Sequence, residues 1–140
     1  MRRFLIVANR TLAGPALMDE VLARQAAGPS LFRIVVPASH DPGSSAWTEG
    51  AAVAHARVTL EQAITAFADV GIPVTGSVGD ENPLLAIGDA LRDASFDEII
   101  VSTLPPGPSR WLKLDLPHRV EREYGLPVTH VVATSQDAAR

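Results

Sequence analysis

Polar residues follow several short apolar segments of the chain, at positions where they could contact a ligand. These groups are Asn9-Arg10-Thr11, residues 37–40, residues 79–82 and residues 102–110. In an open sheet of parallel strands, ligands bind beyond the carboxyl ends of the strands, where the strand order reverses. If the apolar segments are such strands, the polar groups meet at one edge of the sheet and form the candidate binding site.

Three side chains in these groups each have two interpretations. The hydroxyls of Ser102 and Thr103 suit phosphate contacts or phosphorylation, but hydroxyls at a strand end also satisfy backbone groups. The Asp80 carboxylate suits a ribose or a metal ion, but at the start of a helix it also complements the helix dipole. The sequence alone leaves these alternatives open.

Basic and aromatic residues further along the chain have two interpretations as well. Four basic side chains precede or enter the last predicted helix: Arg110, Lys113, His118 and Arg119. They suit a small phosphorylated or carboxylated anion, or simply the solvated start of a helix. Trp111 suits stacking on a base or burial against the sheet. His130, inside the last apolar segment, is predicted to be structural.

Common catalytic and metal-binding motifs are missing from the sequence. It has no Gly-x-Gly-x-x-Gly after the first apolar segment, no P-loop and no Gly-x-Ser-x-Gly elbow. The lack of cysteine excludes disulfides, thiolate nucleophiles and cysteine-bound metals. The four histidines show no i,i+4 pair of the kind that binds zinc on a helix. The sequence therefore predicts no catalytic residue and no metal site.

Five short segments rich in apolar, β-branched residues predict strands. They are residues 4–8, 32–36, 74–78, 98–103 and 128–133. Apolar runs without strict alternation are typical of parallel strands that are covered on both faces.

Helical periodicity occupies the four gaps between these strands. Helices are predicted over residues 15–27 and 49–70, from Asn82-Pro83 onward, and from about residue 116 to Gly125. The first is expected to bury Leu17, Val21 and Leu22. Alternating strands and helices imply right-handed crossovers and a doubly wound, five-stranded parallel sheet with helices on both faces.

The composition predicts one globular domain over residues 1–134, with a frayed tail at 135–140. The chain has 140 residues, of which 46% are hydrophobic, enough for a sizeable core. A net charge of -4 with scattered basic residues argues against nucleic-acid binding. No apolar run approaches the ~20 residues that span a bilayer. We expect a cytoplasmic protein.

Several motifs, taken in order, resemble those of the universal stress protein family. They are residues 4–9, Ser77-Val78-Gly79-Asp80-x-x-Pro83, residues 96–103, His118-Arg119-Val120 and Leu126-Pro127-Val128. The resemblance runs from Arg3 to Val132. It implies the strand order 3-2-1-4-5 and, as in many members of that family, ATP or AMP as the bound cofactor.

The resemblance also implies which residues would hold the nucleotide. Asn9 stands where the family has an acid, and Val36 where a backbone contacts the adenine. In the family's phosphate loop, Gly-x-x-Gly followed after nine residues by Gly-Ser/Thr, Ser102 and Pro105 replace the first two glycines. The predicted cofactor-binding residues are Asn9, Val36, Asp80, Ser102, Thr103, Gly107 and Arg110.

This loop departs from the family pattern in ways that bear on phosphate binding. Pro105, Pro106 and Pro108 remove three amide donors, whereas glycines would let the backbone approach the phosphate oxygens. Asp115 is expected to cap the following helix with its carboxylate and to repel an anion there. Both departures argue against nucleotide binding in the family's manner.

Three functions are compatible with these observations. The preferred one is a non-catalytic, stress-protein-like module that binds an adenine nucleotide or another small anion weakly, or acts through dimer contacts. The alternative is an enzyme of the nucleotide-binding α/β class that acts on a small phosphorylated substrate, and the third is a pure protein-interaction domain. Because the valine-rich fifth strand would lie at a sheet edge, we also expect a homodimer formed through it.

Overall fold

The computed structural model describes residues 1–8, 12, 14–38, 49–103 and 115–133. In chain order the elements are β1 (Arg2–Val7), α1 (Pro15–Ala27), β2 (Ser30–Pro37), α2 (Glu49–Asp69), β3 (Val74–Gly79), α3 (Pro83–Asp93), β4 (Glu98–Thr103), α5 (Leu116–Tyr124) and β5 (Val128–Val132). They match the predicted strands and helices to within about two residues at each end, a normal uncertainty for element boundaries.

All five strands form one parallel sheet in the order β3-β2-β1-β4-β5. The first strand therefore lies in the middle, with Ile6 paired to Ile34 of β2 and to Ile100 of β4. Every residue of β4 is buried, and so are the last four residues of β1. This double burial explains the uninterrupted apolar runs, and both the fold class and the strand order are confirmed.

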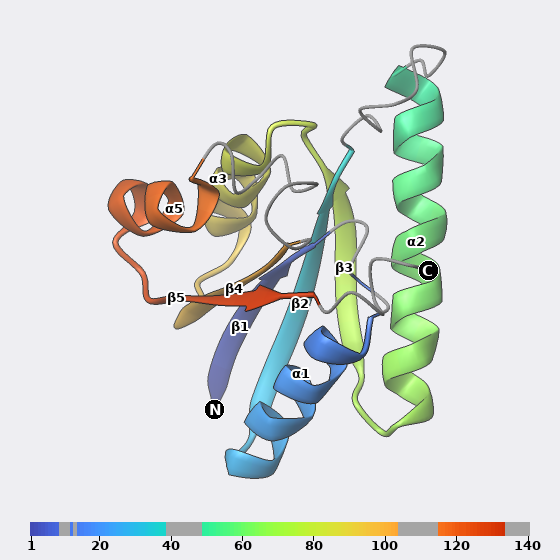
Figure 1. Ribbon diagram of the computed structural model, residues 1–140, viewed down its shortest axis with the longest axis vertical. Coiled ribbons are helices and arrows are strands. Elements are labelled where there is room, and N and C mark those ends of the chain that lie inside the picture. The colour runs from blue at the N-terminus through green and yellow to red at the C-terminus, as the bar shows by residue number, and fades with distance from the viewer. Residues whose placement is uncertain (9–11, 13, 39–48, 104–114, 134–140) are drawn as a thin grey trace.

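Helices cover both faces of the sheet (Figure 1). Phe4 and Ile6 of β1 belong to a core shared with α1 and α2. Leu5 and Val7, which point to the opposite face, belong to a second core shared with α3 and α5. Successive side chains of a strand alternate between faces, so one strand builds both cores.

One detail of the predicted core is wrong. Leu17 and Val21 of α1 are fully buried, but Leu22 is 38% exposed, and Met18 packs against the core in its place. Each residue turns the helix by about 100°, because a turn takes 3.6 residues. Leu22 is therefore carried off the face that Leu17, Met18 and Val21 share.

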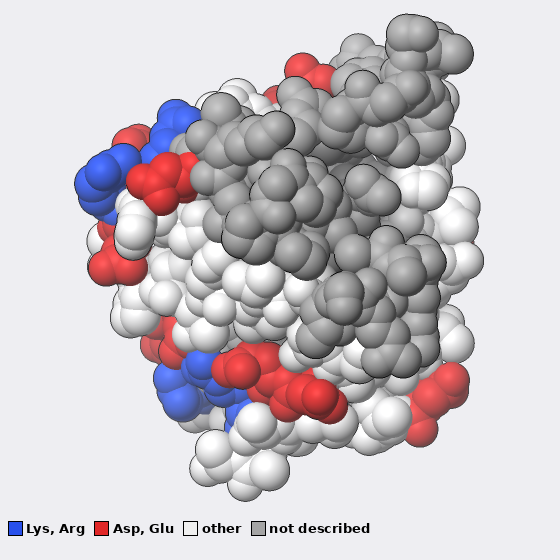
Figure 2. Space-filling view, viewed as in Figure 1, with Lys and Arg blue, Asp and Glu red and all other residues white. Residues whose placement is uncertain are grey.

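The described surface mixes charges of both signs. Figure 2 shows Arg side chains lying next to Asp and Glu side chains on the face it presents. None of the helices described is long and apolar enough to cross a membrane.

Candidate functional site

The candidate site lies at the carboxyl edge of the sheet, around the ends of β1 and β4. The chain runs from β1 to β2 on one side and later returns to place β4 on the other side of β1, so the strand order reverses between these two strands. Ligands of open α/β sheets bind at such a point. Two backbone hydrogen bonds continue the strand pairing at this carboxyl edge. The Ala38 amide donates to the Gly79 carbonyl at 3.1 Å, and the Ala133 amide donates to the Thr103 carbonyl at 2.8 Å.

Thr103 ends β4 at this reversal point and is 2% exposed, as is Ser102 before it. The Thr103 hydroxyl lies 2.7 Å from Nε2 of His130 on the neighbouring strand β5. Partial burial and the nearby His118 both lower the pKa of His130. The imidazole is therefore mostly neutral at pH 7, and it holds the Thr103 hydroxyl in a fixed hydrogen bond.

Asp80 follows β3 and shapes the start of α3. Its Oδ1 accepts a hydrogen bond of 2.8 Å from the Asn82 amide, and the Asn82 side chain in turn accepts one of 3.0 Å from the Leu84 amide. Pro83 occupies the first turn of the helix, as the sequence predicts. One oxygen of the Asp80 carboxylate thus stabilises the turn before α3, which supports a structural role for this residue.

Gly79, in the same motif, lets α3 pack close to the sheet. A Cβ at this position would stand 2.8 Å from the Ala86 Cβ and 2.9 Å from Cγ2 of Val35. Carbon atoms do not approach so closely without strain, so any larger residue would push α3 away from β2. The glycine of the Gly79-Asp80-x-x-Pro83 motif therefore has a packing role.

The predicted capping by the Asp115 carboxylate is wrong. Asp115 is the N-cap residue of α5, but its side chain makes no capping hydrogen bond. Its φ of 54° and ψ of 43° are left-handed, whereas a capping residue has an extended backbone that directs its oxygen at the amides of the first turn. Its Oδ1 instead lies 3.0 Å from Nδ1 of His118.

The structure relates the predicted cofactor-binding residues as follows. Ser102 and Thr103 lie at the reversal point, and Val36 lies near the end of β2 with its side chain in the core shared with α1 and α2. Asp80 is exposed beyond β3, at the outer end of the same edge. Asn9, Gly107 and Arg110 lie outside the described residues, as do Lys113 and Trp111. Residues 134–140, predicted to fray, lie outside them too.

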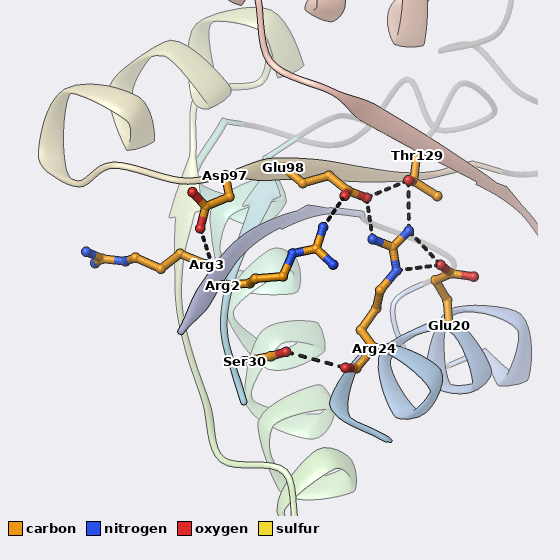
Figure 3. Close-up of polar contacts among 8 residues, drawn as sticks. All are labelled: Arg2, Arg3, Glu20, Arg24, Ser30, Asp97, Glu98 and Thr129. Atoms are coloured by element: carbon orange, nitrogen blue, oxygen red, sulfur yellow. Dashed lines mark hydrogen bonds and ion pairs between the residues drawn. The ribbon is translucent and has the colours of Figure 1, made fainter. Parts of the chain in front are cut away.

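A dense ion-pair network that the sequence does not reveal lies at the opposite edge of the sheet (Figure 3). The Glu98 side chain at the start of β4 is 9% exposed and lies 2.6 Å from Arg24 and 3.1 Å from Arg2. Thr129 donates a further hydrogen bond of 2.6 Å to it. The network joins the amino ends of β1, β4 and β5 to the last turns of α1, at the edge of the sheet opposite the candidate site.

Arg24 is the centre of this network. Burial acts to lower its pKa, but hydrogen bonds to the Glu20 and Glu98 carboxylates and the charges of both raise the pKa above its ordinary value. Its guanidinium also lies 5.3 Å from the centre of the Phe4 ring. Because each charge is paired, we assign the network a structural role. Within the described residues, no group of three or more His, Cys, Asp or Glu could hold a metal ion.

Solved structures of universal stress proteins resemble this chain over almost its whole length. A universal stress protein from Archaeoglobus fulgidus has a TM-score of 0.57 and 16% identity, covering 94% of this chain and 93% of that one. A protein of the same family from Burkholderia pseudomallei has a TM-score of 0.58 and 16% identity, covering 92% and 94%. This chain has the fold of the universal stress proteins.

A third similar structure is the Archaeoglobus fulgidus universal stress protein in complex with dAMP, with a TM-score of 0.56, 15% identity, and coverage of 94% of this chain and 98% of that one. No family model matches the chain. No curated protein matches it either. At this level of identity the likeness to universal stress proteins concerns the fold.

Proposed function

We propose that this protein is a non-catalytic module of the universal stress protein type that binds an adenine nucleotide, AMP or ATP, weakly at the carboxyl edge of its sheet. The observation that carries the proposal is the shared fold, because a universal stress protein with this fold is in complex with dAMP. In the present chain Thr103 and the start of α5 lie at the same edge as the reversal point between β1 and β4. That edge is where the fold places a ligand.

The first turn of α5 supports binding of the phosphate group. The Asp115 carboxylate is paired with His118 and makes no cap bond, so it leaves the first amides of α5 to other acceptors. The positive end of a helix dipole attracts an anion, and free amides can donate to it. Pro117 in the first turn lacks an amide proton, which reduces the number of donors and favours weak binding.

The described side chains at this edge support a non-catalytic role. Asp80 is bonded to the Asn82 amide, and Asp115 to His118. Thr103 and His130 have the chemistry of a nucleophile and a base, but Thr103 is 2% exposed. A nucleophile has to reach its substrate. We therefore prefer a binding module over the alternative of an enzyme acting on a phosphorylated substrate.

We further propose that the protein forms a homodimer through β5. Among the described strands, β5 lies at the end of the sheet and pairs with β4 alone, and Val132 on it is 42% exposed. An unpaired edge with exposed apolar side chains favours pairing with a second strand.

A thermal-shift screen with AMP, ATP, adenosine, NAD and a sugar phosphate tests the proposed ligand class. A ligand present at 100 times its dissociation constant adds about 2.7 kcal/mol of stability, which raises the unfolding midpoint of a domain of this size by roughly 9 °C. We expect AMP and ATP to stabilise the protein at millimolar concentration and adenosine to do so less. A shift with the sugar phosphate alone would favour the enzyme, and no shift with any compound would favour the interaction domain.

A further inference from the structure

The outer edge of β5 presents hydrogen-bonding groups at alternate residues. The Pro127 carbonyl accepts from the Ile99 amide, and the Ala133 amide donates to the Thr103 carbonyl, so the odd-numbered residues of β5 are those that bond to β4. The amides and carbonyls that point away from β4 belong to residues 128, 130 and 132. Among the described strands, β5 pairs with β4 alone.

The side chains of the same three residues share one face of the sheet. Val101, which pairs with His130, belongs to the core shared with α3 and α5, and paired residues of neighbouring strands point to the same face. His130 and Val132 are exposed there, and Val128 is half-buried. The strand bears no Lys, Arg, Asp or Glu, the charges that usually keep an edge strand from pairing. With His130 neutral, β5 therefore does not repel a second copy of itself.

The alternation of β5 selects one register for such a pair. A twofold axis brings the same strand of two copies together in opposite directions. Outward-pointing residues of one strand must then face outward-pointing residues of the other. All three take part only when residue 128 faces residue 132 of the second copy and residue 130 faces its own counterpart. A slip by two residues loses one of the three pairs, so the complete overlap forms the most backbone hydrogen bonds.

We propose that two copies of the chain pair their β5 strands antiparallel about His130, and that protonation of His130 separates them. The inference rests on the proposed homodimer, to which it adds the register and the control by pH. Directly opposed residues have Cβ atoms about 5 Å apart on the same face. The two imidazoles therefore lie beside the twofold axis, where two positive charges repel each other and two neutral rings do not.

The groups around His130 come from three elements. β4 contributes the Thr103 hydroxyl, 2.7 Å from Nε2, and β5 contributes its two valines on the same face. α5 contributes His118, which pairs with the Asp115 carboxylate at 3.0 Å. Burial of the ring and the nearby His118 both lower the pKa of His130, so its surroundings already oppose a charge in the single chain.

The sign of the pH effect follows from what the second copy adds. It covers the ring further and places another imidazole beside it, and both changes lower the pKa of His130 below its value in the monomer. A group whose pKa falls on association loses its proton when the dimer forms, so acid favours the monomer. Since the monomer value already lies below the ordinary 6.5, the dimer is complete at neutral pH and weakens as the pH falls below about 6.5.

Sedimentation velocity at about pH 7.5 and about pH 5, on either side of the ordinary histidine pKa, tests the control by His130. The proteins are wild type, His130→Gln, and His55→Gln as a matched control on α2, which packs on β2 and β3. We expect the dimer dissociation constant of wild type and of His55→Gln to rise about tenfold or more at the lower pH, a typical coupling free energy. In His130→Gln, whose side chain stays neutral, it should change by less than about threefold.

Cysteine cross-linking at about pH 7.5 tests the register, because the chain has no cysteine of its own. His130→Cys should give a disulfide-linked dimer on mild oxidation, since the Cα atoms of directly opposed residues lie about 5.5 Å apart, within the range of a disulfide. Val128→Cys is the matched control. Its counterpart in the second copy lies four residues further along the strand, about 13 Å away, so it should stay monomeric on a non-reducing gel.

The other outcomes separate the inference from the homodimer on which it rests. A wild-type monomer at pH 7.5 would show that the homodimer is wrong, and the inference with it. A dimer with the same dissociation constant at both pH values, or a His130→Gln variant that responds to pH as wild type does, would leave the homodimer standing and overturn the control by His130. Cross-linking through Val128→Cys in place of His130→Cys would overturn the register.

Discussion

Asp115 shows how the local backbone conformation affects which partner a charged side chain contacts. Among the described residues other than glycine, it is the one with a positive φ, at 54°. The left-handed conformation costs an L-residue roughly 1–2 kcal/mol, although aspartate tolerates it better than most. This conformation directs the carboxylate to His118 and away from the amides of α5.

The backbone at this position predicts an order of stability among variants. Asp115→Gly should leave the free energy of unfolding unchanged or raise it by up to about 1 kcal/mol, because glycine adopts positive φ freely. Asp115→Ala should lower it by about 1 kcal/mol, because it keeps the Cβ and loses the His118 contact. Urea unfolding of the three proteins gives the order, and an alanine variant more stable than the glycine variant would contradict this account.

Glu98 is predicted to be important for stability and not for ligand binding. Glu98→Ala leaves Arg24 without its nearest carboxylate, 2.6 Å away, and should lower the free energy of unfolding by about 3 kcal/mol, as removal of one partner of a buried ion pair does. The matched control is Asp93→Ala, whose exposed carboxylate lies 3.7 Å from Arg33 and should contribute less than about 1 kcal/mol. If Glu98→Ala and Asp93→Ala lower the free energy of unfolding in denaturant by the same amount, the Glu98 network stabilises the fold no more than an exposed ion pair does.

At the scale of elements, α3 and α5 are joined by a close contact between Gly88 and Tyr124. The Tyr124 hydroxyl donates a hydrogen bond of 2.6 Å to the Leu84 carbonyl, and burial of the ring raises the pKa of this phenol. A Cβ at Gly88 would stand 2.6 Å from the same hydroxyl oxygen but 3.4 Å from the nearest ring carbon. The two helices therefore come close together at Gly88, because a side chain at that position would collide with the Tyr124 hydroxyl.

This contact predicts coupling between two substitutions. Gly88→Ala should cost about 1–3 kcal/mol in wild type through overpacking, and Tyr124→Phe about 1 kcal/mol through the lost hydrogen bond. In the Tyr124→Phe background the alanine meets no hydroxyl, so its cost should fall by about 1 kcal/mol or more. A double-mutant cycle measures this difference, and strictly additive costs would contradict the contact.

The edge strand β5 allows a test of the proposed homodimer that leaves its pairing with β4 intact. The Pro127 carbonyl and the Ala133 amide bond to β4, so residues 128, 130 and 132 direct their backbone groups to the open edge. Val132→Pro removes one outward amide, and edge strands tolerate proline at such positions.

We expect wild type and Val132→Thr to sediment as dimers at tens of micromolar and Val132→Pro to sediment as a monomer, because the proline removes a donor that a second strand needs. Val132→Thr is the matched control, since it keeps the β-branched shape and the amide. A wild-type monomer under these conditions would exclude the dimer, and a dimeric proline variant would place the interface elsewhere.

At the scale of the whole molecule, the sequence predicts the architecture better than it predicts the polar contacts. The element order and the strand order follow from apolar periodicity and from the family resemblance, because both depend on many residues at once. In the Glu98 network, Glu98 is 96 positions from Arg2 and 74 positions from Arg24 in the sequence, so no local sequence pattern indicates these contacts. The left-handed backbone of Asp115 cannot be predicted from its residue type, so the sequence assigned this carboxylate to the helix amides and not to His118.

A backbone NMR titration with AMP is the sharpest test of whether the carboxyl edge of the sheet binds an adenine nucleotide. We expect the amide resonances of Val36, Thr103 and His118 to shift with AMP in a saturable way. Resonances at the amino edge, such as those of Arg3, Phe32 and Glu98, should stay in place. Shifts confined to the amino edge, or no shifts at millimolar AMP, would rule out nucleotide binding at the carboxyl edge.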